Sequence, residues 1–163
     1  MQKIYIGGIW VKAEYINPFI KASVDILSQM AQLKINVGRP TIKGSPCSAN
    51  NIVILIGITG EIKGQAMLSF DEKMALNIVS RMMGGMEIKE LDEISKSALS
   101  ELGNMILGNS ATLLFNAGVK VDITPPTLMM GTNLSISSDQ LQPICVPLET
   151  EGNKIELNIF VKE

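Results

Sequence analysis

The side chains best placed for chemistry lie within residues 95–116, which read as one long helix. Ser97, Glu101, Asn104 and Gly108 follow one another at spacings of three and four residues, so on a helix they share a sector roughly 60° wide. We call these four residues the ridge. A carboxylate and a carboxamide one turn apart can enter one pocket of a partner together, and the amide both accepts and donates hydrogen bonds. The spacing therefore predicts a site that acts on a docked partner.

The alternative for the ridge is a solvated helix face without a function. Two features weigh against it. Asparagine is disfavoured inside helices because its side chain competes for backbone hydrogen bonds. Gly103 and Gly108 each cost up to about 1 kcal/mol relative to alanine. Glycines tolerated on the exposed side of this helix suggest that another surface approaches it closely.

The opposite side of the same helix is predicted to face the core. Asp92 and Glu93 begin the helix, where negative charge is favourable, and Gly118 ends it. A stripe roughly 140° wide is expected to be buried. Its members are Ile94, Ala98, Leu99, Leu102, Met105, Ile106, Leu113 and Ala117.

Two further helices are expected to help position this one. The first begins at Asn17, as the N-cap with Pro18 in the first helical position, and ends near residue 32. The second is capped by Asp71 and ends near Met83, before a pair of glycines. The length of 163 residues, with 46% hydrophobic and 18% charged, suits one domain over 1–163 and excludes a disordered chain.

Strands are expected between the helices, and residues 45–51 read as a polar loop. The predicted strands are 33–43, which reads as a strand until Pro40, 52–58, 62–70, 119–123, 134–136, 144–148 and 155–161. The segment 52–58 is apolar on both faces and rich in β-branched residues, which predicts a central strand of the sheet. The first ten residues fit either an edge strand or an extension.

The sequence contains an internal repeat. Residues 33–42 align without gaps on residues 119–128, with Pro40 matching Pro126. Each segment follows a long helix and precedes two more strands. We therefore predict duplicated helix-plus-three-strand halves, roughly 13–70 and 92–162. The expected fold class is α+β, with two long helices packed on a mostly antiparallel sheet.

The same repeat predicts that only the second half carries a ridge. Its offset places Tyr15 and Pro18 opposite the glutamate and asparagine of the ridge. A second Glu-x-x-Asn, formed by Glu14 and Asn17, lies out of this register and is interpreted as helix capping.

Composition excludes several classes of function. The chain has no histidine, which removes histidine-dependent nucleophiles, acid–base catalysis and metal sites. Cys47 and Cys145 are far apart, and we expect unpaired thiols in a reducing, cytoplasmic environment. The net charge of −2 without a basic cluster argues against a nucleic-acid partner. No apolar run reaches the roughly 18 residues needed for membrane insertion.

The ridge also carries a family resemblance. Ser97-x-x-x-Glu101-x-x-Asn104, followed by Pro126, resembles the signature of the CheC/CheX/FliY phosphatases. Residues 12–20, Lys-Ala-Glu-Tyr-Ile-Asn-Pro-Phe-Ile, are similar to the opening of CheX, and the duplicated halves fit a CheC-like fold. One copy of the motif, in the second half, is CheX-like, whereas CheC typically has two.

The resemblance implies a phosphatase that acts on the phosphorylated chemotaxis response regulator CheY. Asn104 would orient the attacking water, and Glu101 would pair with the lysine of the regulator's phosphate site. Ser97, Gly108 and Pro126 would support the docking surface. The phosphoaspartate and magnesium would belong to the partner, so no cofactor or metal is expected in this chain.

Two alternatives stay open at this point. The chain could be a non-catalytic adaptor that docks a response regulator or signalling protein through the same ridge. A metabolic enzyme has less support, since the sequence contains no phosphate loop, dinucleotide fingerprint or metal cluster. A homodimer is also expected, because CheX-like proteins dimerise and an apolar edge strand at 155–161 would allow it.

Overall fold

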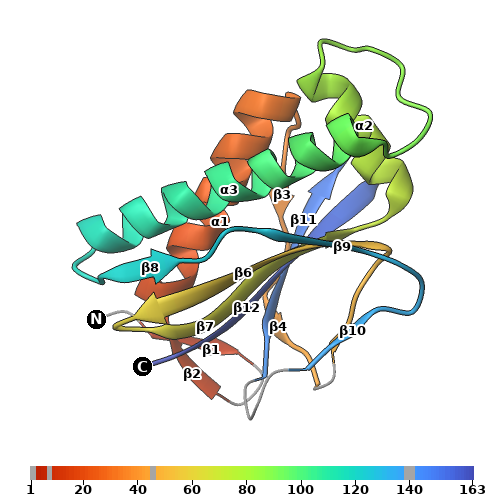
Figure 1. Cartoon of the computed structure of the whole chain (residues 1–163). Helices are drawn as coiled ribbons and strands as arrows, with labels where there is room; N and C mark the ends of the chain where they lie inside the picture. The colour runs from red at the N-terminus through yellow and green to blue at the C-terminus, as the bar shows by residue number, and fades with distance from the viewer. Residues whose placement is uncertain (1–2, 7–8, 45–46, 138–141) are drawn as a thin grey trace.

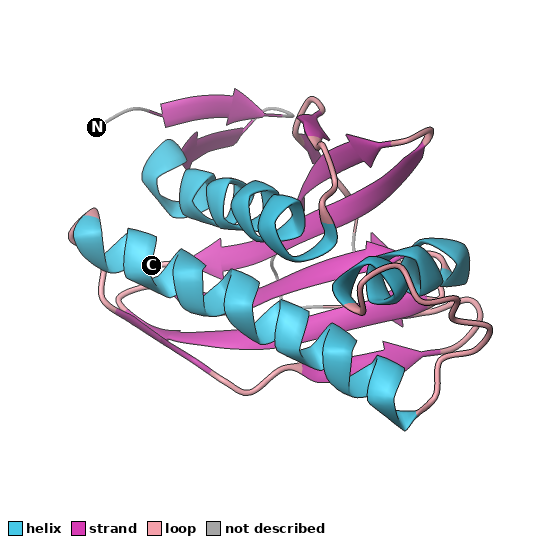
Figure 2. Ribbon diagram, turned by 90° about the horizontal axis from the view of Figure 1, so that it is seen from above, coloured by secondary structure: helices cyan, strands magenta, loops and turns pink. Residues whose placement is uncertain are grey.

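In the computed structural model, the three helices of the described residues cover one face of an antiparallel sheet, as Figure 1 shows. The structure describes residues 3–6, 9–44, 47–137 and 142–163. The helices are α1 (Ala13–Ala31), α2 (Glu72–Met82) and α3 (Glu93–Asn116). Figure 2, seen from above, shows them lying over the strands. The predicted α+β class is confirmed. Among the described helices, none is long and apolar enough to cross a membrane.

The main sheet has eight strands, and all of its pairings are antiparallel. They are β3 (Asn36–Val37), β4 (Thr41–Ile42), β6 (Ile52–Gly60), β7 (Lys63–Phe70), β8 (Val121–Ile123), β9 (Thr127–Met130), β11 (Ile144–Thr150) and β12 (Asn153–Lys162). The order is β3-β11-β12-β7-β6-β8, with β4 also paired to β11 and β9 to β6.

Two smaller strand pairs lie outside this sheet. β1 (Lys3–Ile6) pairs with β2 (Ile9–Lys12), which leads directly into α1. β5 (Cys47–Ser48) pairs with β10 (Ser135–Ile136). The predicted loop at 45–51 lies partly outside the described residues, as does the side chain of Cys47, and its described part includes β5.

The two halves of the chain occupy equivalent places in the main sheet. β7 and β12 pair with each other in the middle. β3 and β4 of the first half pair with β11 of the second, while β8 and β9 of the second half pair with β6 of the first. The two short strands of each half therefore extend the sheet beside the long hairpin of the other half. Within the alternating segment 33–43, the strand predicted to run until Pro40 is reduced to β3. The strand β4 follows Pro40, because proline offers no N–H to a sheet.

The expectation that residues 155–161 form an edge strand is wrong. This segment lies in β12, between β11 and β7, and every residue from Ile155 to Phe160 is buried. A run that is buried on both faces is typical of a central strand. The prediction of a central strand at 52–58 is confirmed. In β6, Ile54 packs toward the helices, while Val53 packs on the other face with Met67 and Phe160.

The buried stripe of α3 is rotated relative to the predicted one, although Leu99, Leu102 and Ile106 are buried as predicted. Ile94 and Ala117 are exposed. The buried residues of α3 are Ser95, Leu99, Leu102, Gly103, Ile106, Leu107, Ser110 and Leu114. A Cβ on Gly103 would lie 2.4 Å from Cγ2 of Ile54, so this glycine serves close packing on β6 and does not face a partner. Small buried residues bring α3 close to its neighbours, and a pattern of large apolar side chains does not detect them.

The predicted start of α1 is also wrong. The helix begins at Ala13 with Lys12 as the N-cap, and no side chain caps it. Asn17 is exposed and Pro18 lies inside the helix. The reason is tertiary, since Ala13 and Ile16 are buried and their burial extends the helix ahead of the proline.

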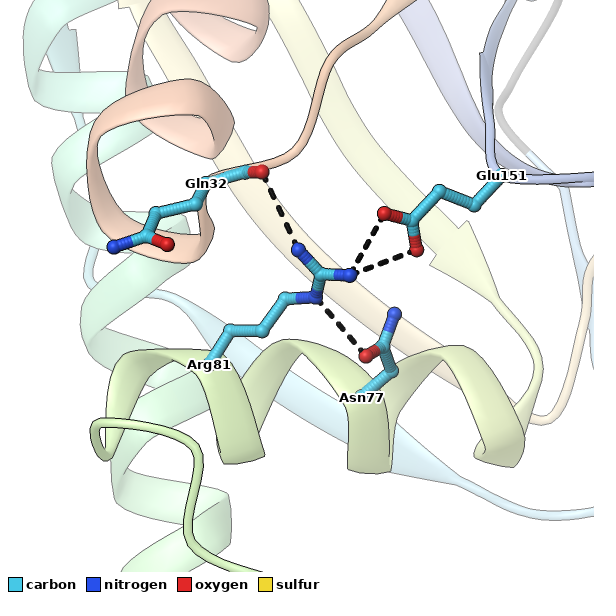
Figure 3. A network of polar contacts seen from close by, with 4 residues as sticks. All are labelled: Gln32, Asn77, Arg81 and Glu151. Carbon is cyan, nitrogen blue, oxygen red and sulfur yellow. Dashed lines mark hydrogen bonds and ion pairs between the residues drawn. The ribbon is translucent and has the colours of Figure 1, made fainter.

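Arg81 joins α2 to two other parts of the fold, as Figure 3 shows. Its Nε donates to Oδ1 of Asn77 at 3.1 Å, and Nη1 donates to the carbonyl of Gln32 at the end of α1 at 3.3 Å. Its Nη2 donates to both carboxylate oxygens of Glu151, at 2.7 and 2.9 Å, in the turn between β11 and β12. These contacts connect α1, α2 and the β11–β12 hairpin. The predicted cap of α2 is confirmed, because Asp71 accepts a hydrogen bond from the N–H of Met74 at 2.7 Å.

Candidate functional site

An open groove of about 770 Å³ runs between α3 and the segment that connects β8 to β9. Figure 1 shows this segment passing beneath α3. The α3 side is lined by Glu93, Lys96, Ser97, Ser100, Glu101 and Asn104. The other side is lined by Ile123, Thr124, Pro125, Pro126 and Leu128.

The groove brings together four of the five predicted site residues. Ser97, Glu101 and Asn104 line it from the helix, and Pro126 lines it from the opposite wall. Gly108 does not line the groove and lies one turn beyond Asn104 on the same face of α3.

Sequence reasoning missed Lys96, Ser100, Thr124 and Pro125, which also line the groove. Lys96 and Ser100 lie outside the 60° sector that defines the ridge, although each is next to a ridge residue in the sequence. The two residues of the opposite wall adjoin Pro126, but no local pattern indicated that this segment folds back toward the helix.

α3, which carries the exposed Glu101 and Asn104, is capped at its N-terminus and packed along one face. The helix starts where it was predicted to start, and Asp92 caps its N-terminus by accepting a hydrogen bond from the N–H of Ser95 at 2.8 Å. This backbone hydrogen bond, which favours the ionised carboxylate, lowers the pKa of Asp92 below its usual 3.8. One face of the helix is buried, and Gly103, between the two polar residues, packs on β6. The glutamate and the asparagine therefore project from a helix whose opposite face is packed on the sheet.

Both polar side chains are available to a partner. Glu101 and Asn104 are exposed, and no described residue forms a hydrogen bond or ion pair with either side chain. Their positions three apart on a helix place their Cβ atoms about 5–6 Å from each other. The pair can therefore contact neighbouring groups of one docked surface.

The opposite wall depends on Gly57 in β6. Thr124 Oγ1 accepts a hydrogen bond from the N–H of Gly57 at 2.8 Å, and the N–H of Thr124 donates to the carbonyl of Gly57 at 3.0 Å. A Cβ on Gly57 would lie 3.0 Å from Cγ2 of Thr124. The missing side chain thus lets the β8–β9 connection bend onto β6, which places Pro125 and Pro126 across the groove from the ridge.

The groove carries charges of both signs. Lys96 and Glu93 form an ion pair at 3.0 Å near the start of α3, and both are exposed enough for it to add little stability. Glu101 supplies a second carboxylate, without a described cation beside it. Among the described residues, no three His, Cys, Asp or Glu side chains are grouped so that they could hold a metal ion. The ridge is thus suited to recognising a cation that a partner brings.

Two buried serines, one in α1 and one in α3, give a different alignment of the two halves from the one that the strand segments give. Ser23 in α1 and Ser110 in α3 are fully buried, and each donates to the carbonyl four residues earlier. Their separation in the sequence exceeds that of the aligned strand segments by one residue. The first half therefore has one more residue between its serine and its strand segment than the second half has. This additional residue lies near the end of α1, where Gln32 adopts a left-handed conformation with φ of 51°.

This helix alignment corrects the predicted correspondence between the halves. It sets Glu14 and Asn17, in place of Tyr15 and Pro18, opposite the glutamate and asparagine of the ridge. Asn17 is exposed on α1, so the prediction that only the second half carries a ridge loses the register on which it was based.

Comparison with known proteins adds independent information about this chain. The sequence model of a family described as chemotaxis phosphatase CheX matches residues 52–149, which include the ridge and Pro126. The CheY-P phosphatase CheX of Thermotoga maritima is 40% identical over 126 residues, which cover 77% of this chain and 81% of that protein.

Solved structures resemble the fold over most of its length. A CheC-like superfamily protein from Shewanella has a TM-score of 0.85 and 26% identity, covering 94% of this chain and 100% of that one. Chemotaxis protein CheX from Desulfovibrio desulfuricans has a TM-score of 0.82 and 26% identity, covering 90% and 99%. A chain of the CheX–CheY–BeF3–Mg2+ complex from Borrelia burgdorferi has a TM-score of 0.77 and 30% identity, covering 93% and 100%.

Proposed function

The chain belongs to the CheX family of chemotaxis phosphatases, and on that premise we propose that it hydrolyses the phosphoaspartate of a CheY-type response regulator. The observation that carries the proposal is the exposed pair of Glu101 and Asn104 in the groove of α3. It is supported by a relative named as a CheY-P phosphatase and by a similar chain solved in complex with CheY.

Asn104 is proposed to orient the attacking water. Water attacks phosphorus, the bond between phosphorus and the aspartate oxygen breaks, and the products are inorganic phosphate and a free carboxylate. The transition state of phosphoryl transfer is loose, so positioning of the water supplies much of the catalysis. A carboxamide can accept a hydrogen bond from the water and donate another to a neighbouring group. This chemistry needs no nucleophile from the chain, which agrees with a sequence that has no histidine.

Glu101 is proposed to pair with the lysine of the regulator's phosphate site. A carboxylate that meets an ammonium group forms a charge-assisted hydrogen bond, which is stronger than a neutral one. Glu101 is exposed beside Asn104, so the same docking event brings both side chains to the phosphorylated site. Docking and chemistry are thus assigned to adjacent residues.

The remaining ridge and wall residues are proposed to support the docked complex. Ser97 and Pro126 line the groove on opposite sides. At Gly108 a Cβ would meet no described atom within 4 Å beyond the neighbouring backbone of its own helix, so the fold does not require glycine there and the space suits an approaching partner. Mg2+ would be held by the regulator, and the chain itself would need no cofactor. Response regulators act in the cytoplasm, so we place the protein there.

The test is phosphate release from a purified CheY-type regulator of the same host, charged with acetyl phosphate. We expect the wild-type protein to accelerate release. Asn104→Ala should lower that acceleration on the order of 10²- to 10³-fold, by analogy with the loss of one transition-state donor. Binding of the variant to the regulator should persist. Asn109→Ala, the same change at an exposed residue of α3 about 140° around the helix from Asn104, is the matched control and should release phosphate at the wild-type rate.

Two results would contradict this proposal in different ways. An Asn104→Ala variant with an unchanged rate would remove the water-positioning mechanism. Binding of the wild-type protein without any acceleration of release would make the chain an adaptor that docks a regulator through the ridge.

A further inference from the structure

Two large apolar side chains of α3 are exposed although the fold has a core that could bury them. Ile94 is 66% exposed and Phe115 is 61% exposed. The chain has four phenylalanines, and the other three, Phe19, Phe70 and Phe160, are at most 1% exposed. Phe115 is therefore the exception among the four phenylalanines, although Tyr5, Trp10 and Met86 are exposed to a similar degree. Large exposed apolar residues beside a polar site are typical of interaction surfaces.

These two residues lie on the same face of α3 as the ridge. At about 100° per residue, Ile94, Phe115 and the four ridge residues fall within roughly 80° of one another. Ile94 is one turn ahead of Ser97, and Phe115 lies two turns beyond Gly108. A surface that contacts Asn104 and extends along the helix in both directions therefore meets both apolar residues.

The spacing along the helix matches the size of a protein partner. At 1.5 Å per residue, Ile94 and Phe115 are about 31 Å apart, with Asn104 almost midway between them. A standard protein–protein interface covers about 800 Å² on each partner, a patch roughly 30 Å across. A small molecule in the groove would reach neither residue, whereas a folded protein domain centred on Asn104 reaches both.

We propose that Ile94 and Phe115 are two apolar anchors that dock the response regulator on either side of the catalytic pair. This inference rests on the proposed function, because it assigns the surface to the same partner. The centre of the interface must stay polar for the phosphoryl chemistry, so the apolar contacts that supply affinity lie at its two ends. Gly108 lies between Asn104 and Phe115 and has no side chain, and no described atom beyond its own helix backbone lies within 4 Å of its Cβ position. A partner can therefore approach the backbone of α3 closely there.

Residues remote from the reacting atoms contact the partner equally in the ground state and the transition state. Their loss therefore raises KM and leaves kcat unchanged, whereas loss of Asn104 lowers kcat. Truncation of a large apolar anchor in an interface weakens binding about tenfold or more. This division of effects separates the anchors from the catalytic pair.

The experiment compares Ile94→Ala, Phe115→Ala and Met86→Ala. Met86 is 63% exposed but lies between α2 and α3, off the ridge, so it is the matched control. We expect each anchor variant to raise KM for the phosphorylated regulator about tenfold at unchanged kcat. Each should also weaken binding to the regulator loaded with beryllium fluoride and Mg2+ by a similar factor. Met86→Ala should match the wild-type protein in both assays, and the Tm of all three should stay near wild type because the side chains are exposed.

The outcomes distinguish failure of the anchors from failure of the proposed function. If Asn104→Ala abolishes acceleration while both anchor variants keep the wild-type KM and affinity, only the anchor assignment is wrong. If the wild-type protein neither binds nor dephosphorylates any regulator of the host, both proposals are wrong. If Phe115→Ala instead converts a dimer into a monomer in light scattering, the surface binds a second copy of the chain and the anchor proposal is overturned.

Discussion

Replacing Gly103 with alanine should disturb the packing of α3 on β6. The Cβ that this change adds would lie 2.4 Å from Cγ2 of Ile54, a distance at which one of the two groups must move. Ile54 is fully buried in the central strand, so it has little room to give way. We therefore expect α3, with Glu101 and Asn104, to shift away from the sheet.

The magnitude follows from comparing Gly103→Ala with Gly108→Ala. Alanine stabilises a helix interior by about 1 kcal/mol relative to glycine, and both variants gain this term. Only Gly103→Ala adds atoms to a packed core, which typically costs about 1–3 kcal/mol. The difference in unfolding free energy between the two variants should therefore be about 1–3 kcal/mol. For a chain of this size that corresponds to a difference in Tm on the order of 5 °C, with Gly108→Ala the more stable.

Urea unfolding followed by circular dichroism measures this difference directly. Ile54→Leu removes the methyl group nearest the new Cβ, so the double variant Gly103→Ala/Ile54→Leu should recover part of the loss and show coupling between the two sites. The reasoning is refuted if Gly103→Ala is as stable as Gly108→Ala. Phosphate release adds a second contrast, because Gly108→Ala should slow turnover of the regulator despite its higher stability, if a partner occupies the open space.

Two further predictions concern stability and assembly. Burial raises the pKa of Glu156, but hydrogen bonds and charges from Lys43 and Lys154, at 2.6 and 3.2 Å, outweigh burial and hold that pKa below its usual 4.5. The stabilisation from this ionised carboxylate is therefore complete above about pH 4.5 and is lost as the pH falls through the lowered pKa. The variant Glu156→Gln should therefore show a smaller fall in Tm at acid pH than the wild-type protein. An equal fall in Tm for both proteins would contradict this prediction. We also expect a homodimer, although β12 cannot supply the edge strand, and a monomeric mass in light scattering would exclude it.

The sequence alone determined the features that depend on neighbours along the chain. The spacing of Ser97, Glu101 and Asn104 fixes their shared side on any α-helix, because 3.6 residues complete a turn. The cap at Asp71 and the helix start at Asp92 were predictable for the same reason, since each depends only on residues within one turn, and each carboxylate accepts from an N–H three residues away.

Other predictions failed because they required contacts between distant residues. Ile94 is exposed because Gly103 turns toward β6, and no local pattern indicates which residue a glycine will face. The segment 155–161 is central because strands of both halves pair on either side of it. Asn17 does not cap α1, since burial of Ala13 extends the helix beyond it.

The candidate site shows the same division. The sequence by itself determined the polar ridge, because a helix repeats within a few residues. Only the tertiary structure decided that the ridge faces a groove, since the opposite wall comes from the β8–β9 connection held by Thr124 on Gly57, which is 67 positions earlier in the chain. Packing between such distant segments also decided that Phe115 remains exposed on the ridge face, because α3 uses its other side to contact the sheet.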